Sequence, residues 1–200
     1  MKINFEIPND NTYHQFCPEC YSENISKIEQ DGKWFYKCAA CGKISPRLIV
    51  IDPKIKYWFD QATKEYWHES VGIFIFNKKN EALFFERVMF PYAYTIPAGH
   101  HDVGESVEEA VKRELFEEAN IKITKVKLFS EEDMLNDPCR RGADKHRWHL
   151  FTGWLEDKPD IKINDEGLVP VWLSLDEALK KELTTPVRYF IEKYGNKLFI

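Results

Sequence analysis

The sequence predicts an α+β or α/β sandwich with a small β-rich unit at its N-terminal end. Four of the five cysteines fall between residues 17 and 41, and the rest of the chain alternates β-prone runs with a few helical segments. A chain of 200 residues can bury one full core and carry a mini-domain. We therefore expect an N-terminal segment at residues 1–50 with a cysteine-rich core at 13–46, a packed connector at 51–66 and a larger domain at 67–200.

The N-terminal unit contains a clear hairpin pattern. The β-prone residues 25–29 and 33–38 flank Asp31-Gly32, and both of these turn residues tolerate positive φ. Residues 51–66 are aromatic and mixed in charge rather than rich in Gly and Ser, so this connector is expected to pack rather than to act as a flexible tether.

Residues 106–119 of the larger domain carry the signals of a helix. Ser106 and Glu109 have the spacing of a capping box, and no Pro or Gly interrupts the segment. Residues 71–76 and 82–87 predict two strands around a polar turn. The other expected strands are residues 94–96, ended by Pro97-Ala98-Gly99, and residues 123–129, 148–155 and 169–173, and the other expected helices are residues 175–183 and 186–194.

The cysteines of the N-terminal unit have the spacing of a metal site. Two Cys-x2-Cys pairs, Cys17 with Cys20 and Cys38 with Cys41, can bring four sulfurs to one tetrahedral Zn²⁺. The first residues lack the apolar stretch of a signal peptide, so we expect a cytoplasmic protein, in which disulfides are disfavoured. A unit this small buries little apolar surface, and a structural zinc would supply the missing folding free energy.

Two glutamates of the segment 106–119 lie on the helix face that also carries its apolar residues. At about 100° per residue, Glu114 and Glu118 project on the same side as Val107 and Val111, whereas Glu109 projects on the opposite side. Unpaired carboxylates that face the body of a protein are costly, so a cation is expected to compensate them. Oxygen ligands favour Mg²⁺ or Mn²⁺.

These residues together resemble the signature of the Nudix family, G-x5-E-x7-R-E-U-x-E-E-x-G-U, in which U is aliphatic. Asn120 stands where the signature has its late glycine, and Asn is the next most tolerant residue in the left-handed conformation that ends such a helix. The resemblance implies a Nudix α/β/α sandwich with a mixed sheet, and hydrolysis of a diphosphate linkage with Mg²⁺ or Mn²⁺. The matching residues are Gly99, Glu105, Arg113, Glu114, Leu115, Glu117, Glu118 and Ile121.

The resemblance also implies roles for these residues. Glu114 and Glu118 would be the main metal ligands, with Glu117 and the carbonyl of Gly99 as further ligands. Glu105 and Arg113 would form a pair that supports the loop and the helix. The catalytic set is therefore Glu105, Arg113, Glu114, Glu117 and Glu118, and the general base stays open among Glu117, Glu131, Glu132, Asp165 and Glu166.

A basic cluster after the glutamate helix is a candidate substrate-binding region. Arg140, Arg141 and Arg147 are expected to contact substrate phosphates, with an ordinary solvated loop as the alternative. Trp148 is a candidate for stacking on a base, although core packing is the more common role of such a residue. Cys139 shows no His and Asn arrangement of a nucleophile and is interpreted as an ordinary cysteine.

A zinc ribbon directly before a Nudix domain is similar to the layout of NADH pyrophosphatases, and Pro46-Arg47 matches a feature of those enzymes. Their downstream segment Ser-Gln-Pro-Trp-Pro-Phe-Pro is absent, because the chain after Ile121 reads Lys-Ile-Thr-Lys-Val-Lys-Leu-Phe. We therefore expect a small nucleoside diphosphate-type substrate, with NADH or NAD as one option among several.

Two other functions are alternatives. A Nudix-fold isoprenyl diphosphate isomerase needs a further catalytic cysteine in a strand near the signature, and Cys139 in its basic loop is a poor candidate. A degraded signature and a basic chain would favour a nucleic-acid or protein-binding module that uses the ribbon. Here the signature is intact and the net charge is −5. The apolar runs at residues 48–51 and 71–76 are far shorter than a bilayer span, so no membrane partner is expected, and a homodimer is left open.

Overall fold

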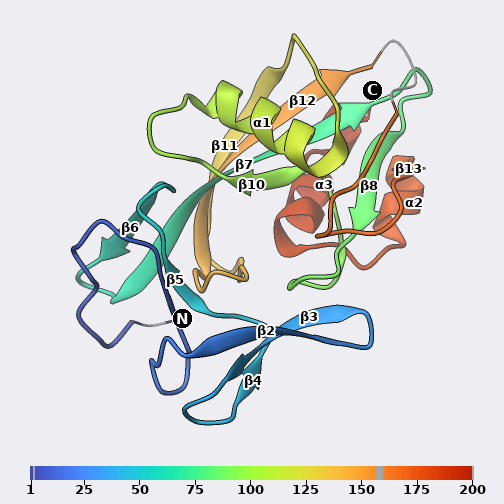
Figure 1. The fold of residues 1–200 in the computed structure, drawn as a ribbon. Helices are drawn as coiled ribbons and strands as arrows, with labels where there is room; N and C mark the ends of the chain where they lie inside the picture. The colour runs from blue at the N-terminus through green and yellow to red at the C-terminus, as the bar shows by residue number, and fades with distance from the viewer. Residues whose placement is uncertain (2, 156–159, 200) are drawn as a thin grey trace.

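A mixed β-sheet with helices on both faces forms the centre of the protein (Figure 1). The computed structural model describes residues 1, 3–155 and 160–199. Five strands run across the sheet in the order β11 (Lys127–Met134), β12 (Lys145–Trp154), β7 (Glu65–Phe76), β8 (Ala82–Glu86) and β13 (Val171–Leu173). The pair β12 and β7 is parallel and the other pairs are antiparallel, so the expected mixed sheet is confirmed.

Three short strands extend this sheet beside its long central strand. β6 (Tyr57–Asp60) and β10 (Ala98–His100) both pair with β7, and β9 (Tyr94–Thr95) pairs with β8. The strand β10 corrects the expectation that Pro97-Ala98-Gly99 simply ends a strand, because Ala98 and Gly99 lie opposite Gly72 and Val71 in the ladder. A strand of three residues is too short to show a period in the sequence.

Helix α1 (Val107–Ala119) covers one face of the sheet, and α2 (Leu175–Leu179) and α3 (Thr185–Leu198) lie on the other side (Figure 1). Successive side chains of β7 point to opposite faces. Val71, Ile73 and Ile75 accordingly pack with α1, whereas Phe74 and Phe76 pack with α3. The expected α/β/α sandwich is therefore confirmed, and both faces of β7 are buried.

The N-terminal residues form two small sheets below this sandwich in Figure 1. β1 (His14–Phe16) pairs with β5 (Ile49–Ile51), and β2 (Ile25–Gln30), β3 (Lys33–Cys38) and β4 (Ile44–Ser45) form a second sheet. The expected hairpin is confirmed, with Asp31 and Gly32 at φ of 52° and 73°.

Several element boundaries differ from the sequence prediction. The strand expected at residues 123–129 is β11, which starts at Lys127, and the helix expected at 175–183 is the shorter α2. Strand β7 begins at Glu65, six residues before the apolar run that predicted it. The sequence did not reveal this first half, because the buried polar residues His68 and Ser70 interrupt its hydrophobic pattern. Within the described ranges, no helix is both long and apolar enough to cross a membrane.

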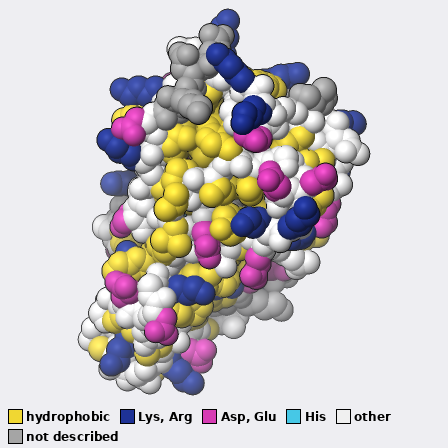
Figure 2. All heavy atoms as spheres, turned by 90° about the vertical axis from the view of Figure 1, so that its right-hand side faces the viewer, with side chains coloured by type: hydrophobic (Ala, Val, Ile, Leu, Met, Phe, Trp, Pro, Cys, Tyr) yellow, Lys and Arg dark blue, Asp and Glu magenta, His cyan; other side chains and the backbone are white. Residues whose placement is uncertain are grey.

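Charged groups of both signs are interspersed with hydrophobic side chains on the face shown in Figure 2. A nucleic-acid-binding surface would instead concentrate Lys and Arg. This face therefore lends no support to the alternative of a nucleic-acid-binding module.

Candidate active site

A cleft of about 390 Å³ opens beside α1 and β10. This size is within the range of small-molecule sites. Most of the residues that the sequence singled out lie around it. The cleft is lined by Gly99, Arg113, Glu114, Glu117, Glu118, Arg140, Arg141 and Trp148, whereas Glu105 and Arg147 are not among its lining residues.

Helix α1 is positioned by local sequence signals at both ends. The Ser106 side chain accepts a hydrogen bond from the Glu109 amide, and the Glu109 side chain accepts from the Ser106 amide, so the expected capping box is present. Asn120 ends the helix at φ 57°, in the left-handed conformation expected at this position. These two ends fix which residues of α1 face the cleft.

Gly99 and Glu114 are in very close contact. A β-carbon built on Gly99 would lie 2.1 Å from Cδ of Glu114 and 2.2 Å from its Oε1, far inside a normal contact. A side chain at residue 99 would therefore displace the Glu114 carboxylate. Burial raises the pKa of Glu114 to about 7, although Arg113 opposes this shift.

Glu118 lies one turn further along α1 and is only 5% exposed. Its Oε2 accepts a hydrogen bond of 2.8 Å from the amide of Ala98 in β10. No described Lys or Arg forms an ion pair with it within 4.0 Å. Burial raises the pKa of Glu118 well above its usual value, so the ionised carboxylate needs a further positive group.

Arg113 connects the loop before α1 to the glutamates of the helix. Its Nη2 and Nε donate to the two carboxylate oxygens of Glu105 at 2.6 and 3.1 Å. Its Nη1 donates to Glu114 at 2.7 Å and to Glu117 at 3.2 Å. Such a fork, with a further bond to the carbonyl of His100 at 3.0 Å, holds Glu105 and the glutamates of α1 in a fixed relative geometry.

Three arginines besides Arg113 line the cleft. Arg140 Nη2 donates to Glu166 at 3.1 Å, and Arg87 Nη2 donates to the same carboxylate at 3.3 Å. Arg141 donates to Asp52 at 2.8 Å. Each of these cations is thus held in place by a carboxylate at the cleft.

Two of the expected substrate-binding residues lie in different surroundings from these arginines. Arg147 pairs with Asp133 at the surface of β11 and β12, away from the cleft lining. Trp148 is 7% exposed, lies next to Gly72 and donates from Nε1 to Asp137 at 2.7 Å. It forms part of the cleft wall and also packs in the core.

The five candidates for the general base separate in space. Glu117 and Glu166 line the cleft. Glu131 and Glu132 form ion pairs with residues outside the cleft lining, and Asp165 borders a second, smaller cavity. Sequence spacing could not make this distinction, because these residues come from three separate parts of the chain: helix α1, strand β11 and the loop before β13.

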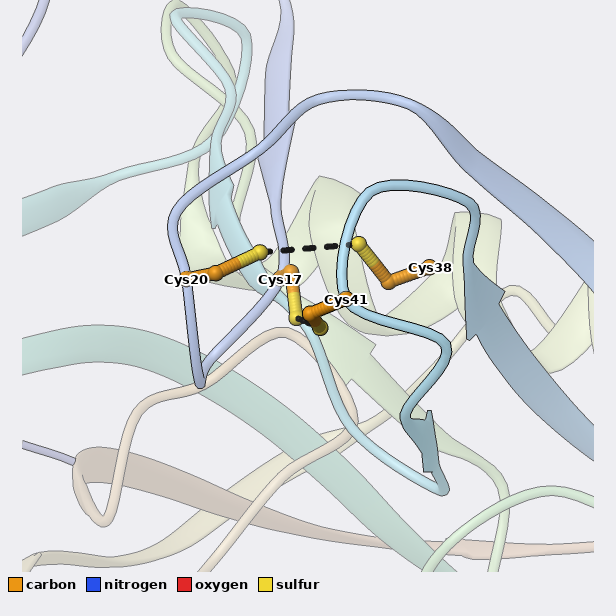
Figure 3. A group of neighbouring side chains, drawn as sticks. All are labelled: Cys17, Cys20, Cys38 and Cys41. Carbon is orange, nitrogen blue, oxygen red and sulfur yellow. Dashed lines mark hydrogen bonds between the residues drawn. The ribbon is translucent and has the colours of Figure 1, made fainter.

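The four N-terminal cysteine side chains point toward one another (Figure 3). Sγ of Cys17 lies 3.7 Å from Sγ of Cys41, and Sγ of Cys20 lies 3.6 Å from that of Cys38. These separations are much longer than a disulfide bond of about 2.05 Å. They are close to the value of about 3.8 Å that two Zn–S bonds enclose at a tetrahedral angle.

Several residues of the cleft were not anticipated from the sequence. Lys54, Arg87 and Phe90 line it without belonging to any motif. His100 and Cys139 also line it, although Cys139 was interpreted as an ordinary cysteine. The sequence signal that could have placed His100 at the cleft is its position directly after Gly99, the first residue of the signature.

Comparison with known proteins identifies the family. A family profile described as the NUDIX domain matches residues 66–194. The chain belongs to the Nudix family. This Nudix chain is 33% identical over 114 residues to an RNA pyrophosphohydrolase of Wolbachia pipientis, covering 52% of the chain and 70% of that protein. It is 30% identical over 116 residues to an asymmetrical bis(5'-nucleosyl)-tetraphosphatase of Caenorhabditis elegans, covering 56% and 83%.

A solved structure agrees on the fold of the Nudix domain. The MutT protein of Methanosarcina mazei superposes with a TM-score of 0.56 at 24% identity, over 66% of this chain and 94% of that one. The expected family, fold and enzyme class, a hydrolase of diphosphate bonds, are thereby confirmed. The substrate is a separate question.

Proposed function

We propose that this Nudix hydrolase binds a nucleoside diphosphate derivative in the cleft and cleaves its diphosphate linkage into two phosphate-bearing products. The observation that carries this proposal is the pair Glu114 and Glu118, a partly buried and a fully buried carboxylate at a cleft that also presents Arg87, Arg140 and Arg141. Carboxylates can bind a divalent cation, and arginines can bind phosphate oxygens. A diphosphate complexed with a divalent cation would satisfy both the carboxylates and the arginines of the cleft.

The residues present fit Mg²⁺ or Mn²⁺. Glu118 is buried without an ion pair among the described Lys and Arg residues, and Glu114 has only Arg113 beside it. We assign Glu114, Glu117, Glu118 and the carbonyl of Gly99 as the ligands. When bound, the ion would neutralise phosphate charge and lower the pKa of a coordinated water.

The chain's own residues supply positioning and proton transfer. Arg140 and Arg141 orient the phosphates from the cleft lining, and Glu105 with Arg113 keeps the glutamate side chains aligned. Glu166 pairs with two arginines, whereas Glu117 pairs with Arg113 alone and its side chain is 53% exposed at the cleft. Glu117 is therefore the better candidate for the general base, a role open to the carboxylate oxygen that does not hold the ion.

The substrate class rests on the relatives and on the shape of the site. The names of the two relatives describe an RNA pyrophosphohydrolase and a bis(5'-nucleosyl)-tetraphosphatase, and both names imply a substrate that carries nucleosides and linked phosphates. Phe90 and Pro91 at the cleft offer an apolar surface for a base. We propose a dinucleotide or similar nucleotide derivative, with NADH or NAD among the candidates.

A substrate panel tests this proposal. Purified protein with Mg²⁺ is incubated with NADH, ADP-ribose, a dinucleoside tetraphosphate, 5'-triphosphorylated RNA and isopentenyl diphosphate, and the products are resolved by chromatography. We expect cleavage of at least one nucleotide substrate into two phosphate-bearing products. Isomerisation of isopentenyl diphosphate with no nucleotide cleaved would replace the hydrolase proposal by the isomerase alternative.

We also propose that Cys17, Cys20, Cys38 and Cys41 hold a structural Zn²⁺. The support is the separation of their sulfur atoms and the closed set of four thiols. Four protein ligands leave no open position for a substrate, so the site would stabilise the N-terminal unit. Native mass spectrometry of protein prepared without chelator tests this, and disulfide mass shifts at these cysteines in fresh protein would contradict it.

A further inference from the structure

A second group of potential metal ligands lies at the cleft, apart from the signature glutamates and the four ribbon cysteines. It consists of His68 in β7, His100 in β10, Cys139 in the loop before β12, and His146 in β12. One ligand atom from each residue lies within 4.8 Å of all the others. The four residues come from distant parts of the sequence, and the sheet brings them together.

The strand register explains the convergence of the histidines. His68 and His146 are direct partners in the parallel ladder between β7 and β12, so their side chains lie on the same face. His100 pairs with Ser70 from the other side of β7, and Ser70 shares that face with His68. Three imidazoles therefore meet on one side of the sheet, where the loop delivers Cys139.

Two separations within the cluster are close to the edges of a tetrahedron around a metal. His68 Nδ1 lies 3.0 Å from His100 Nε2, and Cys139 Sγ lies 3.6 Å from His68 Nδ1. Zinc bonds of about 2.0–2.1 Å to nitrogen and about 2.3 Å to sulfur place two nitrogens about 3.3 Å apart, and sulfur and nitrogen about 3.6 Å apart.

The histidines of this cluster are buried and oriented toward one another. His68 and His146 are 0% and 2% exposed, and His68 presents Nδ1 to both His100 and Cys139. Asp137 Oδ2 lies 3.1 Å from His146 Nδ1 and accepts from Trp148 Nε1. A fixed carboxylate behind an imidazole is the usual support of a metal-bound histidine.

We propose that His68, His100, Cys139 and His146 form a second zinc site. One thiolate and three imidazoles suit Zn²⁺ rather than Mg²⁺, which prefers oxygen ligands. The +2 charge of the ion would be balanced by the thiolate and by Asp137. Because four protein ligands close the site, its role would be structural.

The position of this site gives it a specific effect on the cleft. Cys139 directly precedes Arg140 and Arg141, the two arginines of the cleft wall, and His100 directly follows Gly99. A zinc ion here would join the arginine-bearing loop to β7, β10 and β12. It would thereby fix the distance between the phosphate-binding arginines and the glutamates of α1.

A neighbouring cluster on the opposite face of β7 serves as a contrast. Glu69, His101 and His149 are also close together. They offer only three ligands, and Glu69 Oε1 already lies 2.6 Å from His149 Nε2 and 3.3 Å from His101 Nδ1. His101 Nε2 also donates to the carbonyl of Glu105. This group offers one ligand fewer, and its carboxylate already pairs with both imidazoles, so we assign no metal to it.

Zinc content tests the proposal without any activity measurement. Protein prepared without chelator should contain about two zinc ions per chain, one for each cysteine-containing cluster. Cys139→Ser and His146→Gln should each reduce this by one, whereas His149→Gln, a buried histidine on the same strand, should keep both. Unchanged zinc content in folded Cys139→Ser and His146→Gln proteins would overturn the proposal.

A chemical readout on the unmodified chain covers the case in which these variants do not fold. Cys139 should resist alkylation by iodoacetamide in the zinc-loaded protein and should react once a chelator has removed the metal, as peptide mass spectrometry would show. The same alkylation rate of Cys139 before and after metal removal would overturn the proposal. Neither readout depends on the proposed hydrolase activity.

Discussion

The carboxylate of Glu114 occupies the space beside Gly99 in which any other residue would carry its β-carbon. The two residues are 15 positions apart in the sequence, and the packing of α1 against β10 brings them together. The contact explains in steric terms why the signature begins with glycine. It also makes the site sensitive to a single methyl group.

Gly99→Ala should therefore impair catalysis more than folding. The added methyl group displaces the Glu114 carboxylate, and a displacement of about 1 Å at a catalytic group can cost about 100-fold in rate. Steady-state kinetics and thermal melting of the variant measure both effects. In the double variant Gly99→Ala/Glu114→Asp, the shorter Asp side chain makes room for the added methyl group. The loss in rate of the double variant should therefore be smaller than the product of the losses in the two single variants. A loss equal to that product would contradict the steric explanation.

Glu114→Gln and Glu118→Gln should each lower turnover by a factor on the order of hundreds, because each removes a charge that would hold the metal. Glu118→Gln should also raise the melting temperature of metal-free protein, since it replaces a buried carboxylate that has no ion pair among the described Lys and Arg residues. Glu108→Gln is the matched control, an exposed glutamate on the same helix. Wild-type rates in both active-site variants would refute the assignment.

Arg140→Ala should raise KM by about tenfold or more, because Arg140 is held at the cleft by Glu166 and would bind substrate phosphate. Arg147→Ala should leave KM unchanged, since Arg147 pairs with Asp133 outside the cleft lining. Kinetics with a cleaved nucleotide substrate compare the two. Equal effects of both substitutions would show that net positive charge, rather than position, determines binding.

Arg47→Ala should reduce the free energy of unfolding by about 2 kcal/mol or more, the scale of hydrogen bonds to a charged group. Arg47 Nε donates to the carbonyl of Cys139 at 2.8 Å, and Nη2 donates to the carbonyl of Ala143 at 2.9 Å and to Asp144 at 2.6 Å. Urea denaturation measures the change. Lys43→Ala, at an exposed position of the same N-terminal unit, should change the free energy little, and an equal loss in that control would contradict this role.

The stabilising contribution of Asp144 should be lost in acid. Burial alone would raise the pKa of Asp144, but hydrogen bonds from Met1 and Arg47 outweigh burial and hold it below its usual value. A depressed folded-state pKa contributes stability that is present above the unfolded value of about 3.9 and is lost as pH falls through the folded value. Melting temperatures of wild type and Asp144→Asn should therefore differ at pH 7 and converge as the pH falls below about 4; a constant difference would contradict this linkage.

The sequence by itself determined the features that depend on neighbouring residues. The capping box of Ser106 and Glu109, the left-handed Asn120, the hairpin at Asp31-Gly32 and the two Cys-x2-Cys pairs all act within a few residues. The spacing of Glu114 and Glu118 likewise follows from the turn of one helix. These signals were sufficient for the family, for the helix that carries the glutamates and for the side of the helix they occupy.

Only the tertiary structure decided which distant residues meet. The parallel register of β7 and β12 places His68 opposite His146, 78 positions later in the sequence, and no local pattern specifies that register. The same pairing buries polar residues in the first half of β7, where the hydrophobic pattern fails. The choice of Glu117 and Glu166 over the other acids, and the grouping of Cys139 with three histidines, depend on the same long-range packing, because strand pairing joins side chains across the sheet irrespective of their separation along the chain.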